Sequence, residues 1–122
     1  MCFWLPWVNH KRVERAVKAG VRIAAGSDEY YQAPGMTRGE AAKLMFRAYA
    51  NSGMPPLEII RAATINAAYS LGRHTRVGSL EVNKQADLAV FDVADYREIP
   101  YYFGMSLCWM TMKAGVVIYA AD

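Results

Sequence analysis

Cysteine, histidine and long apolar runs are scarce in this sequence. Its 122 residues include two cysteines, Cys2 and Cys108, whose spacing fits no disulfide framework and no metal or redox motif, so a reducing, cytoplasmic compartment is expected. The two histidines, His10 and His74, have no ligand partner at a metal-binding spacing and are interpreted as ordinary surface residues. No apolar run approaches the roughly 18 residues of a membrane span, so no membrane partner is expected.

The start of the chain lacks the features of a secretion signal. Met1 to Val8 is apolar, but no basic region precedes this stretch and no small-residue cleavage site follows it. We interpret it as the interior of a larger protein, entered at an internal methionine.

A strong charge of either sign is also absent. The net charge of +3 by itself indicates no anionic partner. Lys11, Arg15 and Lys18 share one face of an expected helix. No aromatic platform accompanies them, so we interpret them as the solvated face of an outer helix and expect no nucleic-acid partner. A basic patch that binds nucleic acid is the alternative.

The length excludes a complete eight-stranded α/β barrel, which needs about 250 residues. One small domain with a modest core is what 122 residues allow. The hydrophobic share of 54% is nevertheless high for a solvated domain. Such an excess predicts surfaces that other structure covers.

The stretch that organises the chain is Gly20 to Asp28. Gly20 is suited to end a helix, because glycine adopts the left-handed cap conformation at little cost. The apolar run from Val21 to Ala25 predicts a buried strand of the parallel-sheet type. Asp28 then stands at the strand's C-terminal tip, where α/β barrels place their chemistry. From the residues alone, the alternative is that Asp28 caps the following loop.

Helix signals follow this stretch. Thr37, with Glu40 three residues later, predicts a capping box at the start of a helix. A second helix is expected to begin at Pro55 or Pro56, because the fixed φ of proline suits the first turn. Residues 37–71 are therefore predicted to be largely helical.

The last third of the chain changes to alternating apolar and polar residues. Strands are predicted over residues 86–93, 107–113 and 116–119, the last two joined in a hairpin about Ala114 and Gly115. We therefore predict two domains, an α/β unit over residues 1–72 and an antiparallel β unit over residues 73–122.

Three ordered segments resemble the C-terminal third of the metal-dependent amidohydrolase superfamily. They are GVRIAAGSD, IIRAATINAAYSLG and VGSLEVNKQADLAVFDV, and DYREIPYYFG further resembles the C-terminal signature of the imidazolonepropionase group. The resemblance implies an α/β fold. Residues 1–72 would be the last strand and following helices of a (β/α)8 barrel, and residues 73–122 would be strands of a small composite β-sandwich.

The resemblance also implies a reaction. A metal at the barrel mouth, usually zinc or iron, activates water that attacks a C–N bond in the ring of a cyclic amide. Asp28 matches the aspartate that ends the eighth barrel strand, which implies that it binds the metal or its hydroxide and shuttles the proton. The histidine ligands of the family are absent from this sequence. The metal is therefore expected in an intact parent protein and not in this chain alone.

The loop GSDEYYQAPGMTRGE departs from the imidazolonepropionase pattern and looks more like dipeptidase-like amidohydrolases. Our first hypothesis is a part of a longer cyclic-amide hydrolase that is inactive in isolation. The alternatives are a non-catalytic module derived from the family, and a dipeptidase-like fragment that acts with another chain. The expected partners are a small cyclic amide in the parent, and either a missing N-terminal half or a second copy of the chain.

Overall fold

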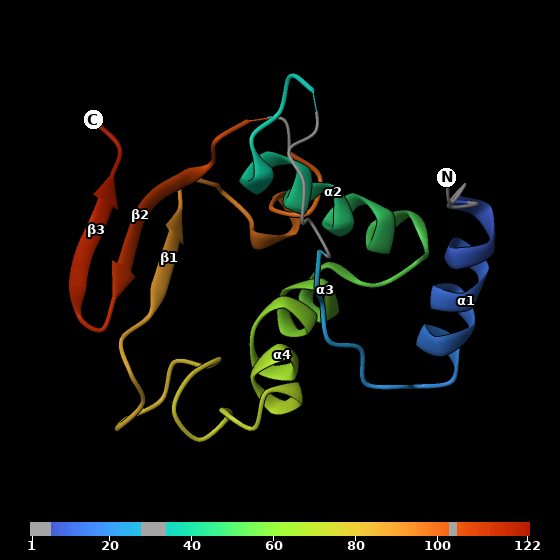
Figure 1. The fold of residues 1–122 in the computed structure, drawn as a ribbon, viewed down its shortest axis with the longest axis horizontal. Helices are drawn as coiled ribbons and strands as arrows, with labels where there is room; N and C mark the ends of the chain where they lie inside the picture. The colour runs from blue at the N-terminus through green and yellow to red at the C-terminus, as the bar shows by residue number, and fades with distance from the viewer. Residues whose placement is uncertain (1–5, 28–33, 103–104) are drawn as a thin grey trace.

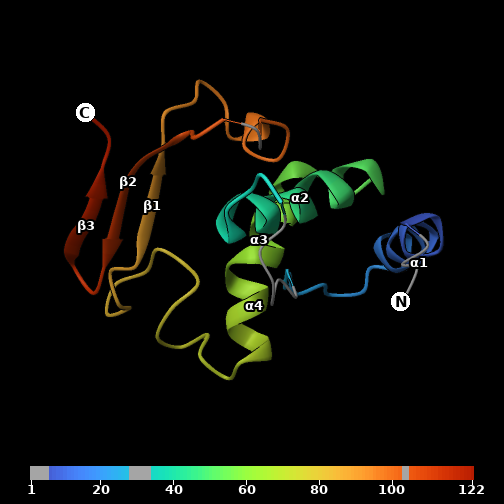
Figure 2. The ribbon, with the colours of Figure 1, turned by 45° about the horizontal axis from the view of Figure 1, so that its top comes forward.

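The computed structural model describes residues 6–27, 34–102 and 105–122. Four helices lie together in one part of the molecule, and a three-stranded sheet lies beside them (Figures 1 and 2). The structure therefore contains both helices and strands, as the predicted α/β class requires, and the four helices precede the three strands in the sequence. No helix within the described ranges is long and apolar enough to cross a membrane.

The first helix, α1, spans Pro6–Lys18 and begins before Asn9, the residue whose side chain favours a helix start. Gly20 ends it as expected, with φ at 67°. The predicted strand over Val21–Ala25 is wrong, because residues 21–27 are extended but belong to no sheet. Val21 is also 57% exposed, so the run is not buried. A strand needs a neighbouring strand to complete its hydrogen bonds, and the described residues provide none at this place.

The second helix, α2, spans Arg38–Asn51 and starts at the predicted capping box. The Glu40 amide donates to the Thr37 hydroxyl (3.2 Å), and the Thr37 amide donates to the Glu40 carboxylate (2.7 Å). These two bonds satisfy donors that the first turn of a helix leaves free. The Thr37 amide and, to a smaller extent, the Thr37 hydroxyl (2.7 Å) donate to the Glu40 carboxylate and hold its pKa below its usual range.

Two short helices complete the helical part. Helix α3 spans Pro56–Ala63, with proline in its first turn as predicted, and α4 spans Ile65–Ser70. Between them Thr64 leaves the helical conformation, with ψ at −95°. The small core lies here, formed by Met54, Ile59 and Ala62. Apolar side chains of α1, α2 and residues 23–25 pack against it.

The sheet contains β1 (Leu88–Phe91), β2 (Cys108–Lys113) and β3 (Val116–Ala120) in that order, with both pairs antiparallel. This confirms the predicted antiparallel unit, although β1 is shorter than residues 86–93. The expected hairpin turn is present, with positive φ at Ala114 and Gly115.

Asp87 ties this hairpin to the start of β1. Its carboxylate accepts from the Gln85 side chain, from Lys113 Nζ (2.5 Å) and from the Ala114 amide (2.8 Å). These donors, with Gln85 first, lower the pKa of Asp87 to about 2. Asp87 is therefore a structural carboxylate that ties the hairpin turn to the start of β1.

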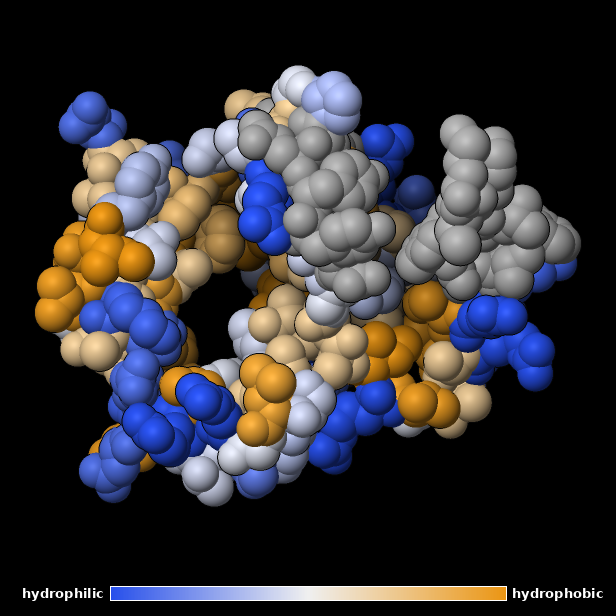
Figure 3. Space-filling view, in the orientation of Figure 1, coloured by the Kyte–Doolittle hydropathy of each residue, from blue (hydrophilic) through white to orange (hydrophobic). Residues whose placement is uncertain are grey.

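The sheet meets the helical part mainly through side chains and loops. Among the described elements, the 3₁₀ helix Tyr96–Glu98 lies against α3, and Lys43 and Phe46 of α2 line a small hollow together with Phe91 of β1 and Cys108 of β2. Lys43 Nζ also donates to the Met105 carbonyl (3.5 Å) in the loop before β2. Figure 3 shows an opening between the strands and the helices that side chains do not fill. The division into domains at residues 72 and 73 stays a prediction.

Candidate functional site

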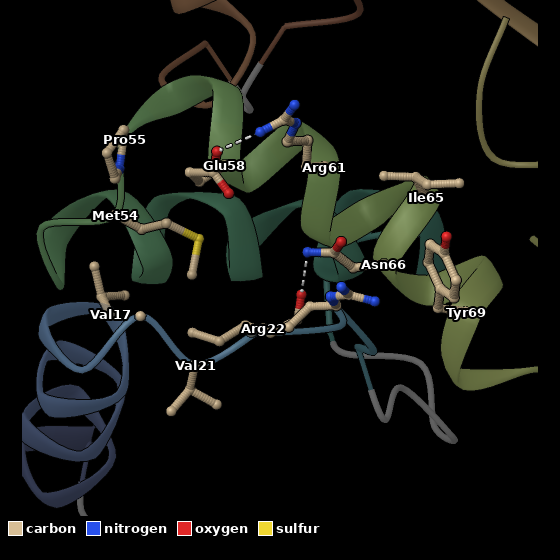
Figure 4. A pocket seen from close by; sticks show the side chains of 12 residues that line it. Val17, Val21, Arg22, Met54, Pro55, Glu58, Arg61, Ile65, Asn66 and Tyr69 are labelled. Atoms are coloured by element: carbon tan, nitrogen blue, oxygen red, sulfur yellow. Dashed lines mark hydrogen bonds and ion pairs between the residues drawn. The ribbon is translucent and has the colours of Figure 1, made fainter.

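The predicted catalytic residue, Asp28, lies outside the described residues. The structure does describe the segment that leads to it, residues 21–27, which runs beside α3 and α4 (Figure 4). The candidate site is therefore built here from the contacts that hold this segment.

Two hydrogen bonds fix the segment to the helices. The Asn66 side chain donates from Nδ2 to the Ile23 carbonyl (2.9 Å), and the Ala25 amide donates to the Ala62 carbonyl (2.8 Å). Asn66 lies in α4, and Ala62 lies in the last turn of α3, where carbonyls have no partner inside the helix. The short, interrupted pair of helices thus offers one donor and one acceptor to the extended chain.

Both bonds lie on the same edge of the segment. In an extended chain the main-chain polar groups of alternate residues point to opposite edges, so Ile23 and Ala25 share one edge while Arg22 and Ala24 share the other. Within the described part of the chain, the main-chain groups of Arg22 and Ala24 have no hydrogen-bond partner. The segment therefore has one satisfied edge and one open edge.

An open hollow of about 550 Å³ lies against this segment, between α1, α3 and α4. Figure 4 shows Arg22, Asn66 and Tyr69 along its wall. Arg61 and Glu58 form an ion pair across one side (3.0 Å), with both side chains about half exposed. Solvent screens such a pair, so it contributes little to stability. The described lining residues include no nucleophile paired with a base.

Among the residues that the structure describes, neither histidine belongs to a group that could hold a metal ion. His10 lies in α1, and its Nδ1 is 3.0 Å from the hydroxyl of Ser52, a buried residue after α2. His74 stacks on Tyr69, with ring centroids 3.9 Å apart. Their prediction as surface histidines is therefore wrong, since both are partly buried and have packing partners. Sequence spacing gave no signal for either contact, because each partner belongs to a different element.

An aromatic stack also anchors Arg22. Its guanidinium lies 4.7 Å from the centre of the Tyr69 ring, which His74 also stacks against. A cation over the face of an aromatic ring is attracted by the ring quadrupole. The stack and the Asn66 bond together hold the start of the segment to α4. Sequence reasoning missed both Asn66 and Tyr69, because their partners in residues 22–23 lie more than forty positions away in the chain.

Comparison with known proteins shows the family to which the chain belongs. The model described as "Amidohydrolase family" matches residues 8–118.

The chain belongs to the amidohydrolase family.

Among curated proteins, it is 41% identical over 105 residues to the imidazolonepropionase of Geobacillus kaustophilus, which covers 85% of this chain and 24% of that protein. It is 39% identical over 112 residues to the imidazolonepropionase of Porphyromonas gingivalis, which covers 91% of this chain and 26% of that protein. The chain thus spans about a quarter of the length of these relatives.

Solved amidohydrolase structures share the backbone arrangement. An amidohydrolase from Thermotoga maritima superposes with a TM-score of 0.70 at 25% identity, covering 92% of this chain and 26% of that one. A Xaa-Pro dipeptidase with bound methionine superposes with a TM-score of 0.73 at 26% identity, covering 92% of this chain and 25% of that one. The helices and the sheet of this chain are therefore arranged much as in these two solved structures, whose chains are about four times as long.

The described residues do not fit a metal centre by themselves. Residues 6–27, 34–102 and 105–122 contain no group of three histidine, cysteine or acidic side chains placed to share an ion. A catalytic zinc takes about three protein ligands. The role of Asp28 as a metal ligand stays a prediction from the family resemblance.

Proposed function

We propose that this chain supplies the C-terminal part of a metal-dependent amidohydrolase that hydrolyses a C–N bond of a cyclic amide, as an imidazolonepropionase does. The observation that carries the proposal is the identity of about 40% to imidazolonepropionases over most of this chain. The family match from residue 8 to residue 118 includes Asp28.

Asp28 is the residue to which we assign the chemistry. A carboxylate beside the attacking water accepts the proton that the water loses as its oxygen bonds to the amide carbon. The same carboxyl group then donates that proton to the ring nitrogen as the C–N bond breaks. The supporting observation is that the preceding segment is extended and held at Ile23 and Ala25, which fixes the point from which residue 28 follows.

In the assembled enzyme, this chain would form part of the α/β barrel and part of the small β-sandwich. Residues 1–72 would provide the eighth strand and its helices, with residues 21–27 completing the barrel wall. Residues 73–122 would provide strands of the small β-sandwich. The resemblance implies zinc or iron, with Asp28 as one ligand and the remaining ligands from outside this chain.

A dipeptidase-like activity is the second candidate. The TM-score of 0.73 to a Xaa-Pro dipeptidase favours it, and so does the loop sequence after Asp28. In that case the bond hydrolysed would be that of a dipeptide and not of a cyclic amide.

A covalent chimera tests the proposal. Residues 8–118 replace the matching quarter of the Geobacillus kaustophilus imidazolonepropionase, and hydrolysis of imidazolone propionate and of a Xaa-Pro dipeptide is measured on the metal-loaded protein. We expect turnover of the cyclic amide. Asp28→Asn should lower kcat by about 10²–10⁴-fold, because an amide cannot accept the proton. Asp92→Asn, a change at an exposed residue after β1, is the matched control and should leave kcat unchanged.

Each contrary result has a defined meaning. Turnover of the dipeptide alone would replace the first candidate by the second. A chimera that folds and hydrolyses neither substrate would favour the non-catalytic module. Full activity of Asp28→Asn would refute the role of Asp28. The isolated 122-residue chain should hydrolyse neither substrate.

A further inference from the structure

The hollow of about 550 Å³ between α1, α3 and α4 has the size of a small-molecule site. Ligand pockets in proteins have volumes of about 300–1,000 Å³, and apolar side chains with a few polar groups line them. Here Val17, Met54 and Ile65 are among the apolar lining residues, and Arg22 and Asn66 are among the polar ones. The proposed hydrolysis uses none of these side chains.

One positive charge in this hollow is uncompensated. Glu58 and Arg61 form an ion pair (3.0 Å), so their charges offset each other (Figure 4). Arg22 is the third charged residue of the lining. Among the residues that the structure describes, its guanidinium lies over the Tyr69 ring and has no carboxylate or carbonyl partner. A guanidinium has five N–H donors, so Arg22 can offer several of them to a ligand in the hollow.

Arg22 is preorganised for such a ligand. Its guanidinium lies 4.7 Å from the centre of the Tyr69 ring, and His74 stacks on the same ring. The stack restricts a long side chain, so less entropy is lost when a ligand binds. Asn66 adds a donor, because one N–H of its amide bonds to the Ile23 carbonyl and the second has no partner among the described residues.

The lining favours one class of ligand. The planar fork of a guanidinium matches the two oxygens of a carboxylate. The aliphatic side chains of Val17, Met54 and Ile65 favour a hydrocarbon group, which gains free energy when it leaves water. A molecule with a carboxylate at one end and a short hydrocarbon chain at the other satisfies both parts of the lining.

We propose that this hollow binds a short aliphatic carboxylate, with its oxygens on Arg22 and Asn66 and its hydrocarbon chain between α1 and α3. Ser27, the last described residue of the segment, lies five residues beyond Arg22, which is roughly 16 Å of extended chain. The site is therefore separate from the one assigned to hydrolysis and does not depend on that function. Because Arg22 belongs to the segment and Asn66 to α4, a ligand that contacts both binds only while the segment lies against the helices.

Titration of the 122-residue chain with hexanoate tests the inference. The readouts are the NMR signal of the Arg22 side chain and hydrogen exchange of the Ala25 amide, which bonds to the Ala62 carbonyl. We expect a saturable shift at Arg22. Ala25 exchange should slow about tenfold at nine times the Kd, because the ligand binds only the docked segment.

Two further ligands separate the charged end from the hydrocarbon chain. Hexanamide has the same shape without the charge and should not bind. Butyrate lacks two methylenes and should bind about tenfold more weakly, since each buried methylene changes affinity by about three- to fourfold. No saturable shift with hexanoate, or binding of hexanamide as tight as that of hexanoate, would overturn the inference.

Matched variants locate the site. Arg22→Gln keeps a planar end that can stack on Tyr69 but removes the charge, so hexanoate binding should weaken by about tenfold or more. Arg22→Lys keeps the charge and should retain more affinity than Arg22→Gln. Arg15→Gln makes the same change at an exposed residue of α1 outside the lining and should bind normally. Normal binding by Arg22→Gln, or an equal loss in Arg22→Lys or in Arg15→Gln, would overturn the inference.

The chimera with the Geobacillus kaustophilus imidazolonepropionase tests whether the hollow stays open beside the rest of an amidohydrolase. It should bind hexanoate at Arg22, whether or not it hydrolyses either substrate. Binding by the 122-residue chain but not by a folded chimera would overturn the inference. A chimera that binds hexanoate but hydrolyses neither substrate would refute the proposed function and leave this site standing.

Discussion

Removal of the Asn66 side chain should loosen the segment that leads to Asp28. The bond from Asn66 Nδ2 to the Ile23 carbonyl is 2.9 Å long, partly buried, and joins residues 43 positions apart. A typical hydrogen bond of this kind contributes about 1 kcal/mol, and an unpaired, partly buried carbonyl adds to the cost of losing it. We therefore expect Asn66→Ala to destabilise the docked segment by about 1–2 kcal/mol.

The assay is amide hydrogen exchange at Ala25. Its amide bonds to the Ala62 carbonyl, so it exchanges when the segment leaves the helices. A change of 1–2 kcal/mol in local opening corresponds to roughly 5–30-fold faster exchange. Asn66→Asp keeps the size of the side chain and lacks the N–H donor, so exchange should also be faster in that variant.

Ser70→Ala is the matched control. It also removes a side-chain to main-chain bond in α4, from the Ser70 hydroxyl to the Ala67 carbonyl (2.8 Å), without touching the segment. Exchange at Ala25 should not change in this variant. If Asn66→Ala leaves Ala25 exchange unchanged, or if Ser70→Ala raises it equally, the assigned role of Asn66 is refuted.

Three further predictions concern the framework around the site. Thr37→Ala should destabilise α2 by about 1 kcal/mol through loss of its cap, measured as faster exchange of the first-turn amides; an unchanged rate would contradict this. Gly78→Ala should lower the thermal unfolding temperature, because the added Cβ would lie 2.7 Å from the Ala68 Cβ and φ is +97°; equal temperatures would contradict it. The pKa of Asp87 is lowered to about 2, so its stabilisation of the hairpin is complete above about pH 4 and is lost as pH falls toward 2. NMR titration of the Lys113 and hairpin amides should show that midpoint, and Asp87→Asn should remove it.

The local elements of this protein follow from the sequence alone. The capping box at Thr37, the proline start of α3 and the turn at Ala114–Gly115 form as predicted. Each depends on residues within about four positions of one another, so their identity and spacing decide the outcome. The three family segments likewise predicted the family that the comparisons show.

Tertiary structure alone decided how these elements meet. The run Val21–Ala25 has the composition of a buried strand, yet a strand exists only where another strand pairs with it, and none of the described residues does so. The contacts that replace that pairing, from Asn66 to Ile23 and from Ala25 to Ala62, join residues about forty positions apart. No local pattern encodes such contacts, because they depend on how α3 and α4 pack against the preceding chain.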